Sequence, residues 1–220
     1  MVSDTYIVYG AQGSGSVPVE AALTLLDLPY RVEEIAPWRS AEEAERMGRI
    51  NPMRQAPALV LPTGELMTES AAILIWLADA HPEAGLSPTM ASIQRPAFLR
   101  WMSFVSSAIY ALYWIRDDPS RVTDRAEDHA SIKARIAERF LQCWSVMDAQ
   151  VSPDRYILGD DITVLDLYVA VVSRWASRRR RFYAAAPKLA EVVRRVDHEP
   201  RLAAFWAERF PFDEGWEGGD

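Results

Sequence analysis

Cysteine, histidine and positive charge are all scarce in this 220-residue chain. The single cysteine, Cys143, excludes an internal disulfide framework and a metal site built from several cysteines. The three histidines, His81, His129 and His198, match no metal-ligand spacing, so no metal is expected. The chain has 24 Lys and Arg against 31 Asp and Glu, a formal net charge of −7. This acidic balance argues against nucleic acid and anionic membranes as main partners.

Long apolar runs are missing as well. No run reaches the roughly 18 residues that a bilayer-spanning helix needs. The first residues lead directly into a strand-like run without the apolar segment of a secretory signal. Half of all residues are nevertheless hydrophobic, which is enough for one large domain or two small ones. These features predict a cytoplasmic protein.

The first 82 residues alternate between strand and helix signals. Runs rich in β-branched and aromatic residues predict strands, and apolar residues at helical spacing predict helices. The resulting order, βαβαββα, predicts an α/β domain of the thioredoxin-like kind over residues 1–82. Its first helix lacks the Cys-x-x-Cys of redox members, so dithiol chemistry is not expected. The expected strands are 5–9, 28–35, 58–61 and 65–68, and the expected helices are 17–26, 40–49 and 70–80.

The remainder of the chain is helical in pattern. Residues 83–90 have the composition of a linker, and residues 91–220 are expected to form an all-helical domain. Thr163 and Asp166 have the spacing of a capping box ahead of a nearly all-apolar helix, which should therefore lie in the domain centre. The basic run at 178–181 is expected to be a solvated helix end.

Pro57 is the most informative single residue. A proline has no backbone N–H and is not tolerated inside a normally paired strand, yet Pro57 opens the apolar run 58–61. If the Ala56–Pro57 bond is cis, the chain turns sharply there, and Ala56 presents its N–H and C=O to a ligand. An extended peptide would then pair with Ala56 like an added strand.

Two motifs carry a family resemblance. Asn51-Pro-Met-Arg-Gln-Ala-Pro-Ala-Leu59, followed by Thr68-Glu69-Ser70, resembles the glutathione-binding signature of soluble glutathione transferases. The stretch 156–168 resembles the capped core helix of the same family, so the resemblance covers roughly residues 5–210. It implies a bacterial, serine-type glutathione S-transferase that acts as a homodimer. Glutathione would be its co-substrate, and the glutathione thiolate would attack an apolar electrophile.

The glutathione sulfur needs a hydrogen-bond donor. A free thiol has a pKa of about 8.5, and lowering it by about two units takes roughly 2.7 kcal/mol. A hydroxyl beside the N–H groups of a helix N-terminus can supply this. The resemblance assigns the role to Ser14, in the loop before the first helix. Ser16 is the rival, and Tyr9 at the end of the first strand is a third candidate. The ordinary alternatives are a loop serine for Ser14, a helix cap for Ser16 and a sheet-face tyrosine for Tyr9.

The resemblance also implies which residues bind the two ends of glutathione. Glu69 would take the γ-glutamyl ammonium, and Ser70 with the helix N-terminus would take the γ-glutamyl carboxylate. Gln55, Arg39 and Arg54 are candidates for the glycyl arm. Helix capping and solvated surface charge are the alternatives for these residues.

Tyr110, Tyr113 and Trp114 are the candidates for an electrophile pocket between the two domains, with core packing as the alternative. The pattern leaves other functions open. One is a different glutathione-dependent enzyme on the same scaffold, such as an isomerase, a dehalogenase, an ether-cleaving enzyme or a peroxidase. Another is a carrier that binds glutathione or apolar ligands without catalysis. A third is an interaction module that has lost glutathione.

Overall fold

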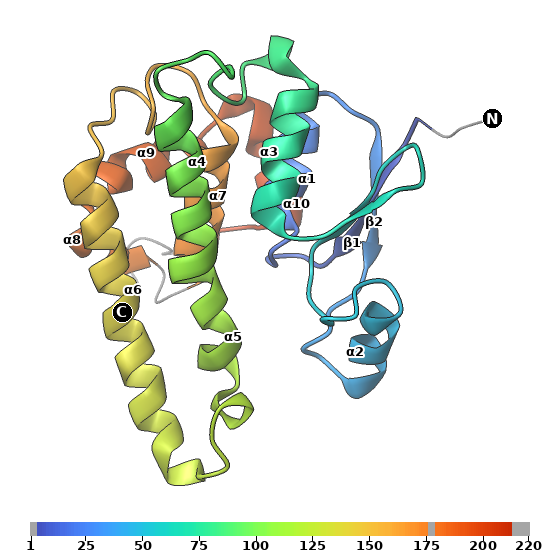
Figure 1. Ribbon diagram of the computed structural model, residues 1–220, viewed down its shortest axis with the longest axis vertical. Helices are drawn as coiled ribbons and strands as arrows, with labels where there is room; N and C mark the ends of the chain where they lie inside the picture. The colour runs from blue at the N-terminus through green and yellow to red at the C-terminus, as the bar shows by residue number, and fades with distance from the viewer. Residues whose placement is uncertain (1–3, 176–178, 213–220) are drawn as a thin grey trace.

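The computed structural model describes residues 4–175 and 179–212, in which a small sheet domain packs beside a larger helical domain (Figure 1). Both kinds of domain agree with the fold class expected from the sequence. The elements of the first domain, in order, are β1 (Tyr6–Gly10), α1 (Val17–Leu25), β2 (Tyr30–Glu34), α2 (Ala41–Gly48), β3 (Ala58–Val60), β4 (Leu66–Met67) and α3 (Ser70–Ala80).

The sheet has the strand order β2-β1-β3-β4. Strand β1 pairs in parallel with β2 through the α1 crossover, and it pairs antiparallel with β3. Strands β3 and β4 form the predicted antiparallel hairpin. Because side chains alternate along β1, Tyr6 and Val8 enter the main core with α1 and α3, whereas Tyr9 packs on the other face, in a small cluster with Met47 of α2.

The helical domain follows a 3-10 turn, η1 (Pro82–Ala84). Its first long helix is continuous but contains a π-helical segment, η2 (Val105–Tyr110), between α4 (Arg95–Phe104) and α5 (Ala111–Asp117). The other helices are α6 (His129–Gln150), α7 (Val164–Arg174), α8 (Arg180–Ala185), α9 (Pro187–Asp197) and α10 (Ala203–Arg209), with the 3-10 turns η3 (Pro119–Arg121), η4 (Ala126–Asp128) and η6 (Pro200–Leu202).

Helix α7 is the buried centre that the sequence predicts, because every one of its residues is buried. The capping box is present: the Thr163 N–H and hydroxyl donate to Asp166 Oδ2 over 2.8 and 2.7 Å. The Ile157 N–H donates to Asp166 Oδ1 over 2.9 Å and ties the preceding loop to the same carboxylate. Burial raises the pKa of Asp166 to about 6.

The basic run departs from its expected solvated position. Arg178 lies outside the described residues, but the Arg179 side chain is fully buried. Its guanidinium pairs with the Asp197 carboxylate and also donates to the Ala170 carbonyl. The expectation was wrong for Arg179 because a carboxylate 18 residues further along compensates its charge inside the domain. Arg181 is half exposed and pairs with Glu138, as a surface charge would.

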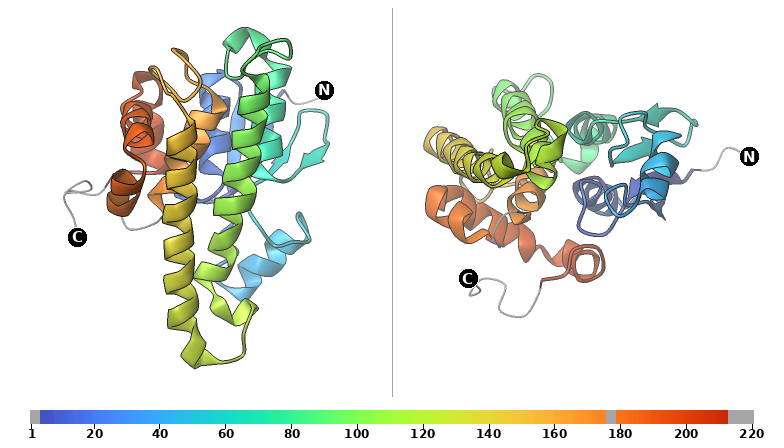
Figure 2. Two further views of the ribbon diagram at one scale, coloured as in Figure 1. Left: turned by 60° about the vertical axis from the view of Figure 1, so that its left-hand side comes forward. Right: turned by 90° about the horizontal axis from the view of Figure 1, so that it is seen from below.

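The two domains meet along α1 and α3. Helix α1 contacts α7, η6 and α10, and α3 contacts α7. Figure 2 shows α10, in red, beside α1, in blue, so the end of the described chain returns to the first domain. This return places the last helix close to the loop that carries Ser14.

Candidate functional site

The loop between β1 and α1 is folded around the Ser14 hydroxyl. Ser14 Oγ accepts the N–H of Ala11 over 3.1 Å and the N–H of Ser16 over 3.2 Å. It also lies 2.9 Å from Ser16 Oγ. Ser14 is buried, but 6% of its surface remains exposed to solvent.

The Ser16 side chain points into the protein interior. Its hydroxyl donates to Glu20 Oε1 over 2.6 Å, and the side chain is fully buried. An ionised carboxylate only accepts, so the Ser16 proton lies toward Glu20, and Ser14 must donate in the contact between the two hydroxyls. Ser16 directly precedes α1 as expected, but its side chain makes no cap hydrogen bond. Of the two serines, only Ser14 has a proton that can turn to a new acceptor without breaking a hydrogen bond to a buried carboxylate.

Glu20 was not among the residues expected from the sequence. It is fully buried, and Arg209 Nε of α10 donates to its Oε2 over 2.5 Å. Arg209 Nη1 also donates to Glu34 Oε1 over 2.6 Å. The available signal was a lone carboxylate on the otherwise apolar pattern of 17–26. Its partner, 189 residues away, has no signal in the local sequence.

Three further hydrogen bonds connect the same loop to the helical domain. The Gly13 N–H donates to the Arg209 carbonyl over 2.9 Å, and Trp175 Nε1 donates to the Gly13 carbonyl over 2.7 Å. Gln12 Nε2 donates to the Glu208 carbonyl over 2.7 Å. The helical domain therefore positions the loop from both of its sides.

The Ala56–Pro57 bond is cis, which confirms the condition set by the sequence. The Ala56 carbonyl accepts the Tyr110 hydroxyl of the helical domain over 3.3 Å. The Ala56 N–H has no hydrogen-bond acceptor within the described ranges 4–175 and 179–212. Asn51 holds the turn, since its Nδ2 donates to the Gln55 carbonyl over 2.8 Å. The Gln55 side chain itself is exposed.

The start of α3 is the third part of the site. Glu69 has a φ of 64°, a left-handed conformation that costs energy in a residue with a side chain and that occurs preferentially at functional sites. No acceptor for the N–H groups of Ser70, Ala71 and Ala72 is found in the described part of the chain. The Ser70 hydroxyl lies 2.9 Å from the Tyr168 hydroxyl, and burial raises the pKa of Tyr168 to about 12.

The remaining candidates from the first domain differ in exposure. Arg39 is exposed, and so is Arg54, which has a φ of 54°. Neither forms an ion pair with another described residue, so both guanidinium groups can accept an anionic ligand. Tyr9 packs with Ile35 and Met47 on the sheet face away from α1. Tyr9 is therefore a tyrosine on the sheet face, and this position does not favour it as the hydrogen-bond donor to the sulfur.

Tyr110, Tyr113 and Trp114 do not share one environment. Tyr110 lies between the domains, with its ring centroid 4.9 Å from that of Trp175. Tyr113 is buried inside the helical domain, and its hydroxyl donates to the Val172 carbonyl over 3.2 Å. Trp114 is 44% exposed, and the Arg121 guanidinium lies over its ring. Of these three, only Tyr110 has a hydrogen bond to the Ala56 backbone.

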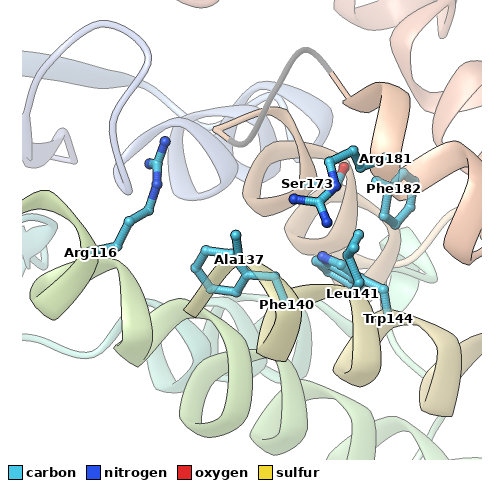
Figure 3. Close-up of a pocket in the computed structure, with 8 residues that line it drawn as sticks. All are labelled: Arg116, Ala137, Phe140, Leu141, Trp144, Ser173, Arg181 and Phe182. Atoms are coloured by element: carbon cyan, nitrogen blue, oxygen red, sulfur yellow. The ribbon is translucent and has the colours of Figure 1, made fainter. Parts of the chain in front are cut away.

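A separate cavity lies inside the helical domain (Figure 3). It is lined by Arg116, Ala137, Phe140, Leu141, Trp144, Ser173, Arg181 and Phe182. Its volume of about 60 Å³ accommodates a few water molecules, whereas ligand pockets have roughly 300–1,000 Å³. None of its lining residues belongs to the serine loop, the Ala56 turn or the start of α3. We therefore do not assign it to the site.

Two kinds of feature are absent from the described residues. Within the described residues, no group of three His, Cys, Asp or Glu side chains is placed to hold a metal ion. In the same residues, no helix combines the length and the apolar character that crossing a bilayer demands.

Comparisons with known proteins match both domains. The family model described as glutathione S-transferase, N-terminal domain, matches residues 16–80, and the one described as glutathione S-transferase, C-terminal domain, matches residues 113–209. The uncharacterised GST-like protein YncG of Escherichia coli K12 is 27% identical over 196 residues, which cover 89% of this chain and 94% of that protein.

Solved structures of similar shape include two with bound glutathione. A glutathione transferase homologue from Sulfitobacter has a TM-score of 0.82 at 24% identity, covering 92% of this chain and 97% of its own. A sphingomonad glutathione S-transferase in complex with glutathione has a TM-score of 0.74 at 26% identity, covering 90% of this chain and 96% of its own. The first of these likenesses is evidence for the fold alone.

Proposed function

The chain belongs to the glutathione S-transferase family, whose two domain models together match more than two thirds of it, and we propose that it transfers glutathione to an apolar electrophile by a serine-type mechanism. Glutathione is the co-substrate. In this function, residues 1–82 would form the glutathione-binding domain, 83–90 the linker and 91–220 the pocket-forming helical domain. A cytoplasmic location is part of the same proposal.

The observation that carries this proposal is the Ala56 N–H, which has no acceptor among the described residues, together with the open N–H groups at the start of α3. The cysteinyl residue of glutathione would pair its backbone with Ala56, as a strand pairs with a sheet edge. The adjacent start of α3 offers open N–H groups to the γ-glutamyl carboxylate, with Ser70 beside them. The exposed Glu69 carboxylate would bind the γ-glutamyl ammonium. Gln55, Arg39 and Arg54 are proposed for the glycyl arm.

Ser14 is proposed as the sulfur donor. Its oxygen is held by two backbone N–H groups, and its proton is shared only with Ser16, so the hydroxyl can turn to a thiolate. A charged acceptor forms the stronger hydrogen bond, and the exchange therefore favours the thiolate over the thiol. The thiolate would then attack an electrophilic carbon, and no covalent bond to the protein forms.

The electrophile is proposed to bind beside Tyr110 and Trp114, the two less buried aromatic residues of the three candidates. Tyr113 is left out of this wall, because its ring stacks on Phe140 inside the helical domain at a centroid distance of 4.5 Å.

Ser14→Ala is the test of the donor. We expect turnover of an activated aryl chloride to fall by about 10- to 100-fold near neutral pH, since loss of the donor raises the bound thiol pKa by roughly one to two units. The dissociation constant for glutathione, measured by calorimetry, should stay within about threefold, because the backbone contacts persist. Full activity in Ser14→Ala combined with lost activity in Ser16→Ala would identify Ser16 as the donor instead.

A further inference from the structure

Tyr110 brings a second hydroxyl to the place where the sulfur is proposed to lie. It comes from the last residue of the π-helical segment η2, on the helical domain. Its hydroxyl donates to the Ala56 carbonyl over 3.3 Å, a long distance for a hydroxyl donor. A π-helical insertion changes which way the following side chains point, and such insertions recur at functional sites.

Gly15 lies against the Tyr110 hydroxyl on the side of the serine loop. A Cβ placed on Gly15 would lie 1.8 Å from the Tyr110 hydroxyl oxygen and 3.1 Å from the Ala56 carbonyl oxygen. The hydroxyl therefore fits between the serine loop and the Ala56 turn only because residue 15 has no side chain. Gly15 directly follows Ser14, so the Tyr110 hydroxyl lies against the backbone of the serine loop.

The surroundings keep Tyr110 protonated and in place. Burial raises the pKa of Tyr110 well above its usual range, so its oxygen carries a proton to donate under physiological conditions. The ring packs against Trp175, whose indole N–H holds the Gly13 carbonyl of the serine loop. Besides the Ala56 carbonyl, no hydrogen-bond partner of the Tyr110 hydroxyl is found among the described residues.

We propose that Tyr110 is a second catalytic donor, supplied by the helical domain, whose hydroxyl turns from the Ala56 carbonyl to the glutathione sulfur. This inference rests on the proposed function. When the cysteinyl N–H of glutathione pairs with the Ala56 carbonyl, that oxygen gains a better-placed donor, and the adjacent thiolate becomes the stronger acceptor for the Tyr110 proton. Only hydrogen bonds are exchanged. Ser14 and Tyr110 would then hold the thiolate from two directions.

The test compares two tyrosines of the same long helix. Tyr110→Phe removes the proposed donor, and Tyr113→Phe removes a buried hydroxyl that is bonded inside the helical domain. The pKa of bound glutathione is measured on the full-length protein from the ultraviolet absorbance of the thiolate as a function of pH. The pH profile of kcat/KM with an activated aryl chloride provides a second, independent value.

We expect Tyr110→Phe to raise the bound thiol pKa by about one unit, which leaves roughly tenfold less thiolate below that pKa. The glutathione dissociation constant should change by less than about threefold, and Tyr113→Phe should leave the thiol pKa unchanged. An unchanged pKa in Tyr110→Phe, with Ser14→Ala still raising it, would overturn the inference and leave the proposed function intact. An equal rise in both tyrosine variants would also overturn it, because packing would then be the cause. If the wild-type protein does not bind glutathione, the proposed function fails first.

Discussion

At the scale of single residues, the site depends on a buried ion pair behind the serine loop. The Glu20 carboxylate accepts a hydrogen bond from the Ser16 hydroxyl on one side and from the Arg209 guanidinium on the other. Gly10 belongs to the same arrangement, since a Cβ there would lie 2.2 Å from both Ser16 Cβ and Ser16 Oγ. Gly10, Glu20 and Arg209 thus hold the loop in position, and none of the three is proposed to contact glutathione.

Arg209→Met is expected to destabilise the protein by about 3–5 kcal/mol, because it leaves a fully buried carboxylate without its cation. The measurement is the free energy of unfolding in urea. Arg181→Met is the matched control, since it removes the same group from a pair with an exposed Glu138 and should cost less than about 1 kcal/mol. Equal losses in the two variants would contradict the assigned importance of the buried pair.

Features encoded by neighbouring residues could be predicted from the sequence, whereas contacts between residues far apart in the chain could not. The turn at Asn51, the cis bond at Pro57 and the cap at Thr163 are all encoded within a few positions, so their patterns could be read from the sequence. The contact of Tyr110 with Ala56 spans 54 positions, and that of Arg209 with Glu20 spans 189. A local sequence pattern does not predict such pairings. The burial of Arg179 was missed for the same reason, since its partner Asp197 lies 18 residues away.

At the scale of elements, α7 shows how a carboxylate can organise a helix start at a pH-dependent energetic cost. Asp166 accepts three hydrogen bonds in a fully buried position. Burial raises its folded pKa to about 6, whereas its ordinary value is 3.8. The folded state therefore holds this proton more tightly than the unfolded state, and the stabilisation from protonation is lost as the pH rises through about 6.

Asp166→Asn has no titrating group at this position. We expect the stability difference, wild type minus Asp166→Asn, to fall by about 1.4 kcal/mol between about pH 5 and about pH 7.5. Chemical unfolding at the two pH values measures it. Asp161→Asn, on the exposed loop before α7, controls for the removal of one acidic charge. A difference that grows with pH would show that the hydrogen bonds to the carboxylate outweigh its burial.

At the scale of the whole molecule, the two domains build one site and leave an apolar surface uncovered. The site takes its backbone contacts from the first domain and Tyr110, Trp175 and Arg209 from the second. Outside the site, Met90 and Ile93 ahead of α4 are 78% and 95% exposed, and Leu99 of α4 is 39% exposed. A homodimer, which the family likeness implies, would bury such a surface.

If the homodimer implied by the family resemblance forms through this surface, Ile93→Asp shifts the protein from dimer to monomer, because a carboxylate would have to be buried in the interface. Sedimentation velocity over a concentration series measures the change. Val122→Asp is the control, since Val122 is also exposed but follows η3, beyond the end of α5, whereas Ile93 precedes the start of α4. A wild-type protein that sediments as a monomer at all concentrations would show that this prediction is wrong.

The pairing of Glu20 with Arg209 also has a consequence for synthesis on the ribosome. Domains generally fold as they emerge, with the N-terminal one first. Here the carboxylate beneath the serine loop must wait for a cation that is translated 189 residues later. The nascent first domain would carry an unmatched carboxylate throughout that interval, so its serine loop would reach its final structure only after residue 209 has been synthesised.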